Sequence, residues 1–203
     1  LYSERLGWIG SLTYIDAKSG YWLSMLEETD FSFYGYTVDP GLEYSLHPGA
    51  NLISFPSHGN IDISDGIPDE VEDQFTGIIS EGVAAINNDG TWAGSLTAFE
   101  GTKGYWVQVQ SALSFSFDLT NLSEDATSRV SIAKAPSGYE YKQSSQQAFY
   151  FIESVANIEI GDWILAYNGD VVIGARQWTG ETTDVPAMGD DGYDFTKGYI
   201  QAG

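Results

Sequence analysis

The stretch "GYWVQVQ", residues 104–110, predicts a β-strand whose two faces differ in polarity. Side chains alternate along a strand, so every second residue shares a face. One face carries Tyr105, Val107 and Val109, and the opposite face carries Trp106, Gln108 and Gln110. The largest apolar side chain of the stretch, Trp106, therefore lies on the polar face. This placement suggests that something contacts that face of the strand.

The same pattern occurs earlier in the chain, as part of an internal repeat. The segment "WIGSLTYIDAKSGYWLSMLEETDFSF", residues 8–33, aligns without gaps to "WAGSLTAFEGTKGYWVQVQSALSFSF", residues 92–117, at a constant offset of 84. The two segments share 11 of 26 positions, including the turn glycines and the final Phe-Ser-Phe. Such self-similarity indicates a repeated structural unit, in which Trp22 takes the place of Trp106.

The repeat divides the chain into parts. Residues 35–91 have no counterpart before Trp8, so the first copy is expected to be only half of a unit. After the second copy the pattern changes, and Asn168-Gly169 predicts a tight β-hairpin. Because the chain starts at Leu1 without Met, we expect a piece of a longer protein. Three parts are predicted: a partial unit at 1–34, a complete unit at 35–120, and a second β module at 121–203, incomplete at its C-terminus.

The composition favours a mostly β fold. Aromatic residues make up 14% of the chain and charged residues 18%, while Gly, Ser and Thr are abundant, which suits strands and tight turns. We expect two β-sandwich-like modules, the first with a short α-helix at about residues 66–80. Asp65 as a cap, Pro68 in the first turn and the acidic run at 69–73 support that helix. The sequence Asn88-Asp89-Gly90 predicts another hairpin.

The charge balance excludes some partners. Eight basic and 29 acidic residues give a net charge of −21, which repels phosphate backbones and anionic lipid, so no nucleic-acid partner is expected. Solubility in salty water, cation binding and attraction to basic partners remain open as explanations. No stretch approaches the roughly 18 to 20 apolar residues of a membrane span, and no membrane insertion is expected. The absence of cysteine leaves the redox compartment undetermined.

Catalytic chemistry has little support in the sequence. His47 and His58 are the only histidines, and both fall in predicted turns. The chain has no G-x-S-x-G elbow, H-E-x-x-H, P-loop or G-x-G-x-x-G motif. The densest acidic run, residues 69–73, is better explained by a helix start than by a pair of glycosidase carboxylates. The chain is therefore predicted not to be an enzyme.

A cation is the one cofactor that the sequence suggests. The run "GDDGYD" places Asp190, Asp191 and Asp194 around Gly192, so that a loop gathers oxygen atoms of the kind that calcium prefers. The spacing does not match an EF-hand. An acidic turn without a metal ion is the competing interpretation.

The polar face of the Trp106 strand supports two interpretations. Trp106 can stack on a sugar ring while Gln108 and Gln110 bond its hydroxyls, and Trp22 offers the same platform in the first copy. Alternatively, both tryptophans pack beneath a neighbouring part of a protein, since a side chain repeated in two units often belongs to their shared architecture. The packing interpretation is preferred.

The motifs resemble a known group of proteins. "GANLISFP", followed by "GSLT" and "GYWV", resembles repeat modules in large secreted surface proteins of marine and Bacteroidetes-type bacteria, which often leave the cell by type IX secretion. The segment from "SQQAFYF" to "DVPAMGDDG" is similar to a β module found near such repeats. The resemblance rests on turn glycines and core aromatics. It implies an extracellular multi-module protein and carries no catalytic residues with it.

Function is therefore expected to be structural. The leading hypothesis is a non-catalytic structural or adhesive module of an extracellular bacterial surface protein, whose partners are other modules or copies of itself. One alternative is a subunit of an extracellular filament, assembled by strand complementation between neighbours. The other is a carbohydrate-binding module that uses its surface tryptophans on a glycan.

Overall fold

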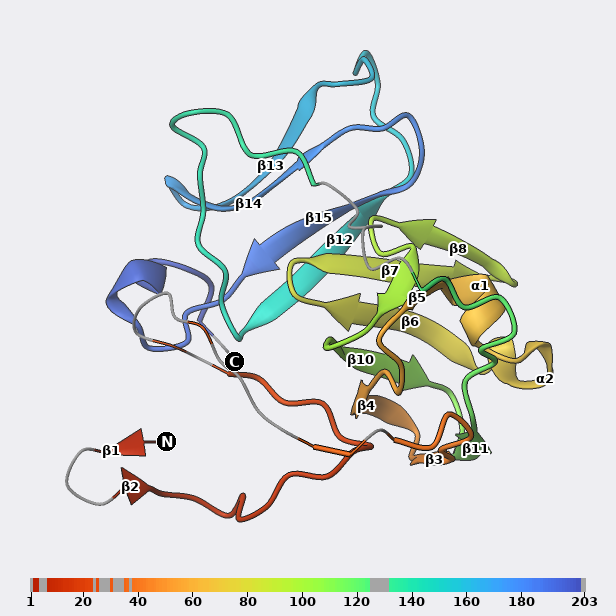
Figure 1. Ribbon diagram of the computed structural model, residues 1–203. Helices are drawn as coiled ribbons and strands as arrows, with labels where there is room; N and C mark the ends of the chain where they lie inside the picture. Colours follow the sequence, from red (N-terminus) through yellow and green to blue (C-terminus); the bar gives the residue numbers. More distant parts are fainter. Residues whose placement is uncertain are drawn as a thin grey trace.

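The computed structural model describes residues 2–3, 7–23, 25, 30, 35–36, 38–124 and 132–201. The chain is mostly β, as predicted (Figure 1). Its elements in chain order are β1 (Tyr2–Ser3), β2 (Gly7–Trp8), β3 (Tyr44–Leu46), β4 (Gly49–Ser54), β5 (Asn60–Asp62), α1 (Ile63–Gly66), α2 (Asp69–Glu72), β6 (Phe75–Ser80), β7 (Val83–Asn88), β8 (Thr91–Gly94), β9 (Ala98–Glu100), β10 (Gly104–Val109), β11 (Leu113–Phe115), β12 (Gln147–Ile152), β13 (Trp163–Asn168), β14 (Val171–Gln177), β15 (Thr183–Met188) and η1 (Asp194–Thr196).

The strand predicted from "GYWVQVQ" lies inside the largest sheet. This antiparallel sheet has the order β4-β10-β6-β7-β8, so β10 pairs with β4 on one side and β6 on the other. Tyr105, Val107 and Val109 are almost fully buried on one face, as their alternation predicts. Antiparallel pairing then fixes the opposite face, where Trp106 lies beside Leu52 of β4 and Ile79 of β6.

A second layer covers the Tyr105 face of this sheet. It consists of two small antiparallel sheets, β3–β11 and β5–β9, together with α1. Aromatic side chains fill the space between the layers: the ring of Phe99 lies 4.9 Å from the rings of both Tyr105 and Phe117 in mostly edge-on contacts. One continuous core thus joins both layers, and the complete unit is β-sandwich-like.

The predicted helix at about 66–80 is confirmed only in its first part. The chain forms the short helices α1 and α2 around this point, and Pro68 is the N-cap residue of α2. Asp65 lies inside α1 and caps no helix. The second part was predicted wrongly, because Phe75–Ser80 is strand β6. This strand lies between β10 and β7 and buries the β-branched Ile78 completely, and the surrounding sheet outweighs the acidic helix signal.

Both predicted hairpins are confirmed. In the β7–β8 turn, Asp89 and Gly90 have φ angles of 51° and 85°, a left-handed pair that Asp-Gly sequences favour. β13 and β14 pair antiparallel around a turn that begins at Asn168, and the next residue, Gly169, has a φ of 61°. The local sequence was sufficient to place these two turns.

The C-terminal module is built from two strand pairs, β12–β15 and β13–β14. Its small core includes Ile173, Met188 and Tyr199. β15 packs against β14 within the module and also contacts β7 and β8 of the complete unit. In Figure 1 the β12–β15 pair lies between β13–β14 and the main sheet. Residues 125–131, in the predicted boundary between the modules, lie outside the described part of the chain.

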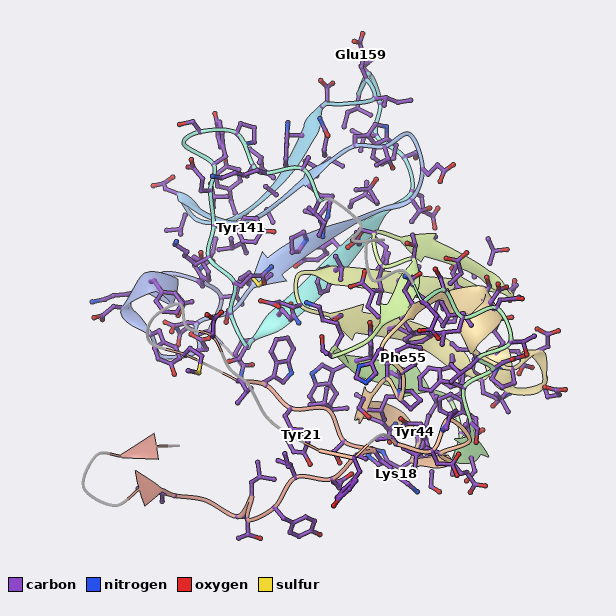
Figure 2. All side chains as sticks on the ribbon, in the orientation of Figure 1. Lys18, Tyr21, Tyr44, Phe55, Tyr141 and Glu159 are labelled. Atoms are coloured by element: carbon purple, nitrogen blue, oxygen red, sulfur yellow. The ribbon has the colours of Figure 1, made fainter. Side chains whose placement is uncertain are left out.

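The first copy of the repeat runs along the outer edge of β4. Ser19 forms an antiparallel bridge with Ile53, and Gly20 N–H donates to the Leu52 carbonyl at 3.1 Å. Ser54 N–H donates to the Lys18 carbonyl at 3.0 Å. Figure 2 shows Lys18 and Tyr21 on this segment, near Tyr44 of the complete unit. The final Phe-Ser-Phe of this copy, residues 31–33, lies outside the described residues.

Within the described ranges, none of the helices has the length and apolar character needed to cross a membrane.

Candidate functional site

A buried carboxylate joins the C-terminal module to the complete unit. Asp184 of β15 is 1% exposed. Its Oδ1 accepts the Ser95 N–H at 2.7 Å, and its Oδ2 accepts the Ala84 N–H at 3.1 Å and the Ser95 hydroxyl at 2.8 Å. One side chain of the C-terminal module thereby fixes the ends of β7 and β8.

Arg176 of β14 completes the junction. This side chain is 5% exposed, and its Nη2 lies 3.1 Å from Asp184 Oδ2 in a buried ion pair. Nη2 also donates to the Gly82 carbonyl at 2.6 Å, while Nε donates to the Asp184 carbonyl at 2.9 Å. Removing one partner of such a buried pair costs about 3–5 kcal/mol, because the other charge is left uncompensated. The pair itself lies within the C-terminal module, and its hydrogen bonds to Gly82, Ala84 and Ser95 connect it to the complete unit.

Gln147 of β12 adds a third contact to the same turn. Its side-chain oxygen accepts the Gly82 N–H at 3.3 Å, and its Nε2 donates to the Ser80 carbonyl at 3.2 Å. Strands β12, β14 and β15 thus each form hydrogen bonds to the β6–β7 region, so several strands of the C-terminal module hold the junction together.

The electrostatics of the junction follow from its burial. Loss of hydration raises the pKa of Asp184 above its ordinary value of 3.8. The Arg176 charge and the Ser95 hydrogen bonds act in the opposite direction but do not cancel the effect of burial. The folded protein therefore binds a proton at Asp184 more readily than the unfolded chain does.

The sequence Gly94-Ser95 is the part of this junction that the repeat preserves. Gly94 has a φ of 130°, and a Cβ atom there would lie 2.3 Å from the Ala84 carbonyl oxygen, so only glycine fits. In the first copy Gly10 has a φ of 141°, and Ser11 follows it as Ser95 follows Gly94. The glycine conformation that precedes Ser95 in the complete unit therefore also precedes Ser11 in the first copy.

A second contact occurs in both copies. The Tyr105 hydroxyl accepts the Glu100 N–H at 2.6 Å, and the Tyr21 hydroxyl accepts the Asp16 N–H at 2.8 Å. These are equivalent residues at the offset of 84. The turn between the two strands of the repeat thus closes in the same way in both copies, which confirms the structural meaning of the alignment.

Asp16 strengthens this turn in the first copy. Its carboxylate accepts the Ser19 hydroxyl at 2.8 Å and the N–H groups of Lys18 and Ser19 at 2.9 and 3.0 Å. The Ser19 hydroxyl contributes most to lowering the pKa of Asp16, and burial acts in the opposite direction without cancelling the effect of the hydrogen bonds. The turn is therefore ordered by bonds within the segment itself.

The two copies differ sharply in burial. Apolar positions that form the core in the second copy lie open in the first. The exposed fractions, first copy against second, are 65% for Leu12 and 8% for Leu96, 72% for Ile15 and 1% for Phe99, 62% for Leu23 and 0% for Val107, and 58% for Met25 and 2% for Val109. The first copy thus presents an apolar face, Leu12, Ile15, Leu23 and Met25, which we call the half-unit face.

The predicted ligand row is only partly assembled. Trp106 is half-buried and lines an open groove of about 470 Å³ with Leu52, Tyr44 and Lys18. Gln108 and Gln110 are exposed and do not line this groove. Trp22 is 39% exposed on the first copy and also lies outside it. Of these four residues, Trp106 lines the groove and the other three do not.

The predicted calcium residues bond the protein itself. Asp190 accepts the Gly192 N–H at 2.8 Å and the Gln201 amide at 2.8 Å. Asp191 accepts the Ser145 N–H at 3.0 Å and the Thr196 hydroxyl at 2.8 Å.

The third calcium candidate, Asp194, is exposed in η1. Among the described residues, no three His, Cys, Asp or Glu side chains come together in a way that would hold a metal ion. Burial tends to raise the pKa of Asp191, but hydrogen bonds from Ser145 and Thr196 outweigh it and lower the pKa. These contacts give the carboxylates a role in closing the loop that needs no metal ion.

Sequence reasoning did not find the junction pair. Arg176 lies in β14 and Asp184 in β15, and the residues around each of them in its strand are mostly apolar. A single charged residue within such a strand indicates a buried ion pair or hydrogen-bond partner, because buried charges are normally paired. Their partner elements, β7 and β8, are about 90 residues away in the sequence, which concealed the contact.

Searches of family models, curated proteins and solved structures found no match to this chain.

Proposed function

We propose that the chain is a non-catalytic structural module of an extracellular bacterial surface protein, in which repeat units and β modules join into one rigid body. The observation that carries this proposal is the set of hydrogen bonds by which the buried Arg176–Asp184 pair of the C-terminal module holds Gly82, Ala84 and Ser95 of the complete unit. Domains in one chain move relative to each other by default unless their interface is large or strongly fixed. Here, rotation at the junction would break these hydrogen bonds to two buried charged groups.

The repeat supports the same role. Both copies close the same turn through a tyrosine hydroxyl. In the complete unit, large aromatic side chains are buried in a core between two layers. A net charge of −21 suits a surface held in solution in salty water outside the cell. The resemblance to repeat modules of secreted surface proteins points in this direction as well.

A glycan-binding role is the second candidate. It rests on the groove in which the half-buried Trp106 lies beside Tyr44 and Lys18. Aromatic faces and a few polar groups are the usual elements of a sugar site.

The experiment that tests the structural role compares Asp184→Ala with Asp170→Ala, an exposed carboxylate at the tip of the β13–β14 hairpin. We expect the parent protein and Asp170→Ala to unfold in one transition by calorimetry. Asp184→Ala should unfold in two transitions and become sensitive to protease between the modules. Two independent transitions in the parent protein would contradict a rigid body. Glycan-array binding that Trp106→Ala abolishes in a folded protein would favour the second candidate.

A further inference from the structure

The residues of the half-unit face have equivalents in the complete unit, where the structure shows which elements pack over them. In the complete unit the equivalent residues, Leu96, Phe99, Val107 and Val109, pack against elements from residues 44–88. β4 and β6 flank β10 on both sides, with Ile53 opposite Tyr105 and Ile78 opposite Val107. The cover of this surface in one copy is thus visible in detail, and it comes from the first half of the repeat.

The half-unit face shares its turn contact and its alternation with the equivalent surface of the complete unit. Its turn closes through the same tyrosine contact as in the complete unit, at 2.8 Å from Asp16 N to the Tyr21 hydroxyl. Leu23 and Met25 alternate with Trp22 as Val107 and Val109 alternate with Trp106. Residues 21–23 belong to no strand in the described structure, so their positions in a sheet are open to a new neighbour.

A second copy of residues 1–203 would gain no contact by supplying the cover. Residues 1–203 contain one first half, residues 35–91, and two second halves, residues 8–33 and 92–117. The first half already covers its own residues 92–117 in the main core. If it moved to a neighbour's half-unit face, it would expose an equal apolar face on its own chain, and no contact would be gained.

We propose that the half-unit face is a docking site for the first half of another repeat unit, a polypeptide segment with the sequence pattern of residues 35–91. Docking adds strands beside residues 21–23 and buries Leu12, Ile15, Leu23 and Met25. The result is a second sandwich joined to the first through the contacts of Lys18 and Gly20 with β4. This inference rests on the proposed function and specifies the partner with which the module assembles.

The test adds the missing half. Residues 35–91 are placed directly before Trp8, in place of residues 1–7, so that the new junction copies the natural one between Thr91 and Trp92. Hydrogen exchange is measured on peptides covering residues 9–23 in the original and the extended protein. We expect exchange to slow by at least about tenfold, toward that of residues 93–107, because the amides become part of a covered sheet.

A matched control carries Ile53→Asp and Ile78→Asp in the added segment only. Peptides covering residues 93–107 report that the original unit is still folded, and exchange of residues 9–23 should return to that of the original protein. Leu23→Asp in the extended protein should have the same effect.

Two results would overturn the inference. One is unchanged exchange of residues 9–23 in an extended protein whose residues 93–107 stay protected. The other is concentration-dependent protection of residues 9–23 in the original protein, which would make a second copy the occupant. Either result leaves the junction of Arg176 and Asp184 untouched, so the proposed function is tested separately by Asp184→Ala.

Discussion

Residues 8–25 and 92–109 carry the same pattern and meet opposite surroundings. Both form the turn that the tyrosine hydroxyl closes, and both place a glycine with positive φ before a serine. Val107 is fully buried while its equivalent Leu23 is 62% exposed. The comparison separates what a segment does by itself from what its partners do to it. The local sequence is sufficient for the turn geometry, whereas burial of the apolar side chains requires the first half of a repeat unit to pack against them.

The largest difference between the copies is expected at positions 99 and 15. Phe99→Ala should lower the free energy of unfolding by about 3–5 kcal/mol, since it removes a fully buried ring from the core. Ile15→Ala should change it by less than about 0.5 kcal/mol, because Ile15 is exposed. Urea denaturation followed by circular dichroism measures both. Equal losses at the two positions would show that the first copy is buried in solution.

A smaller difference is expected at the shared tyrosine. Tyr105→Phe removes the acceptor of the Glu100 N–H inside the core and should cost roughly 1–2 kcal/mol. Tyr21→Phe removes the equivalent acceptor in a more open site, where water can replace it, and should cost less than about 0.5 kcal/mol. The same denaturation experiment compares them. If Tyr21→Phe proved the more costly, the first copy would be held by its turn more strongly than its exposure suggests.

The smallest expected effect is the pH dependence of the unfolding free energy that Asp184 causes. This carboxylate bonds Ser95 of the second copy. Burial raises the pKa of Asp184, so the folded state holds its proton more tightly than the unfolded state, where the value is 3.8. The resulting stabilisation is complete below that value and is lost as the pH rises through the folded pKa. From about pH 4 upward, the parent protein should therefore lose stability relative to Asp184→Asn.

The measurement is the difference in unfolding free energy between these two proteins across the acidic range. Ser95→Ala should alter the difference, since the Ser95 hydroxyl bonds this carboxylate, whereas Ser11→Ala should not. A difference that grows in favour of the parent protein with rising pH would contradict the direction of the shift.

Much of the fold was accessible from the sequence because its signals are local. Alternation in residues 104–110 placed Tyr105 and Val107 in the core, and Asp-Gly and Asn-Gly pairs placed two hairpins. The helix prediction failed at Phe75–Ser80, where an acidic helix signal precedes a strand that only its neighbours β10 and β7 define. Of the candidate site, the repeated turn was visible in the sequence, while the Arg176–Asp184 junction was not.

The sequence by itself determined the strand at 104–110 and the two hairpin turns, since each depends on residues a few positions apart, and its internal similarity determined the existence of two copies of one unit. The tertiary structure decided which copy is buried, because a core needs a partner surface that alternation cannot identify. It also decided the surroundings of Trp106: neighbours on β4 and β6, and an open groove that Gln108 and Gln110 do not line. The hydrogen bonds of Asp184 with Ser95 and Ala84 belong to the same class, because burial made partners for this charge necessary and only the packing of two modules could supply these two.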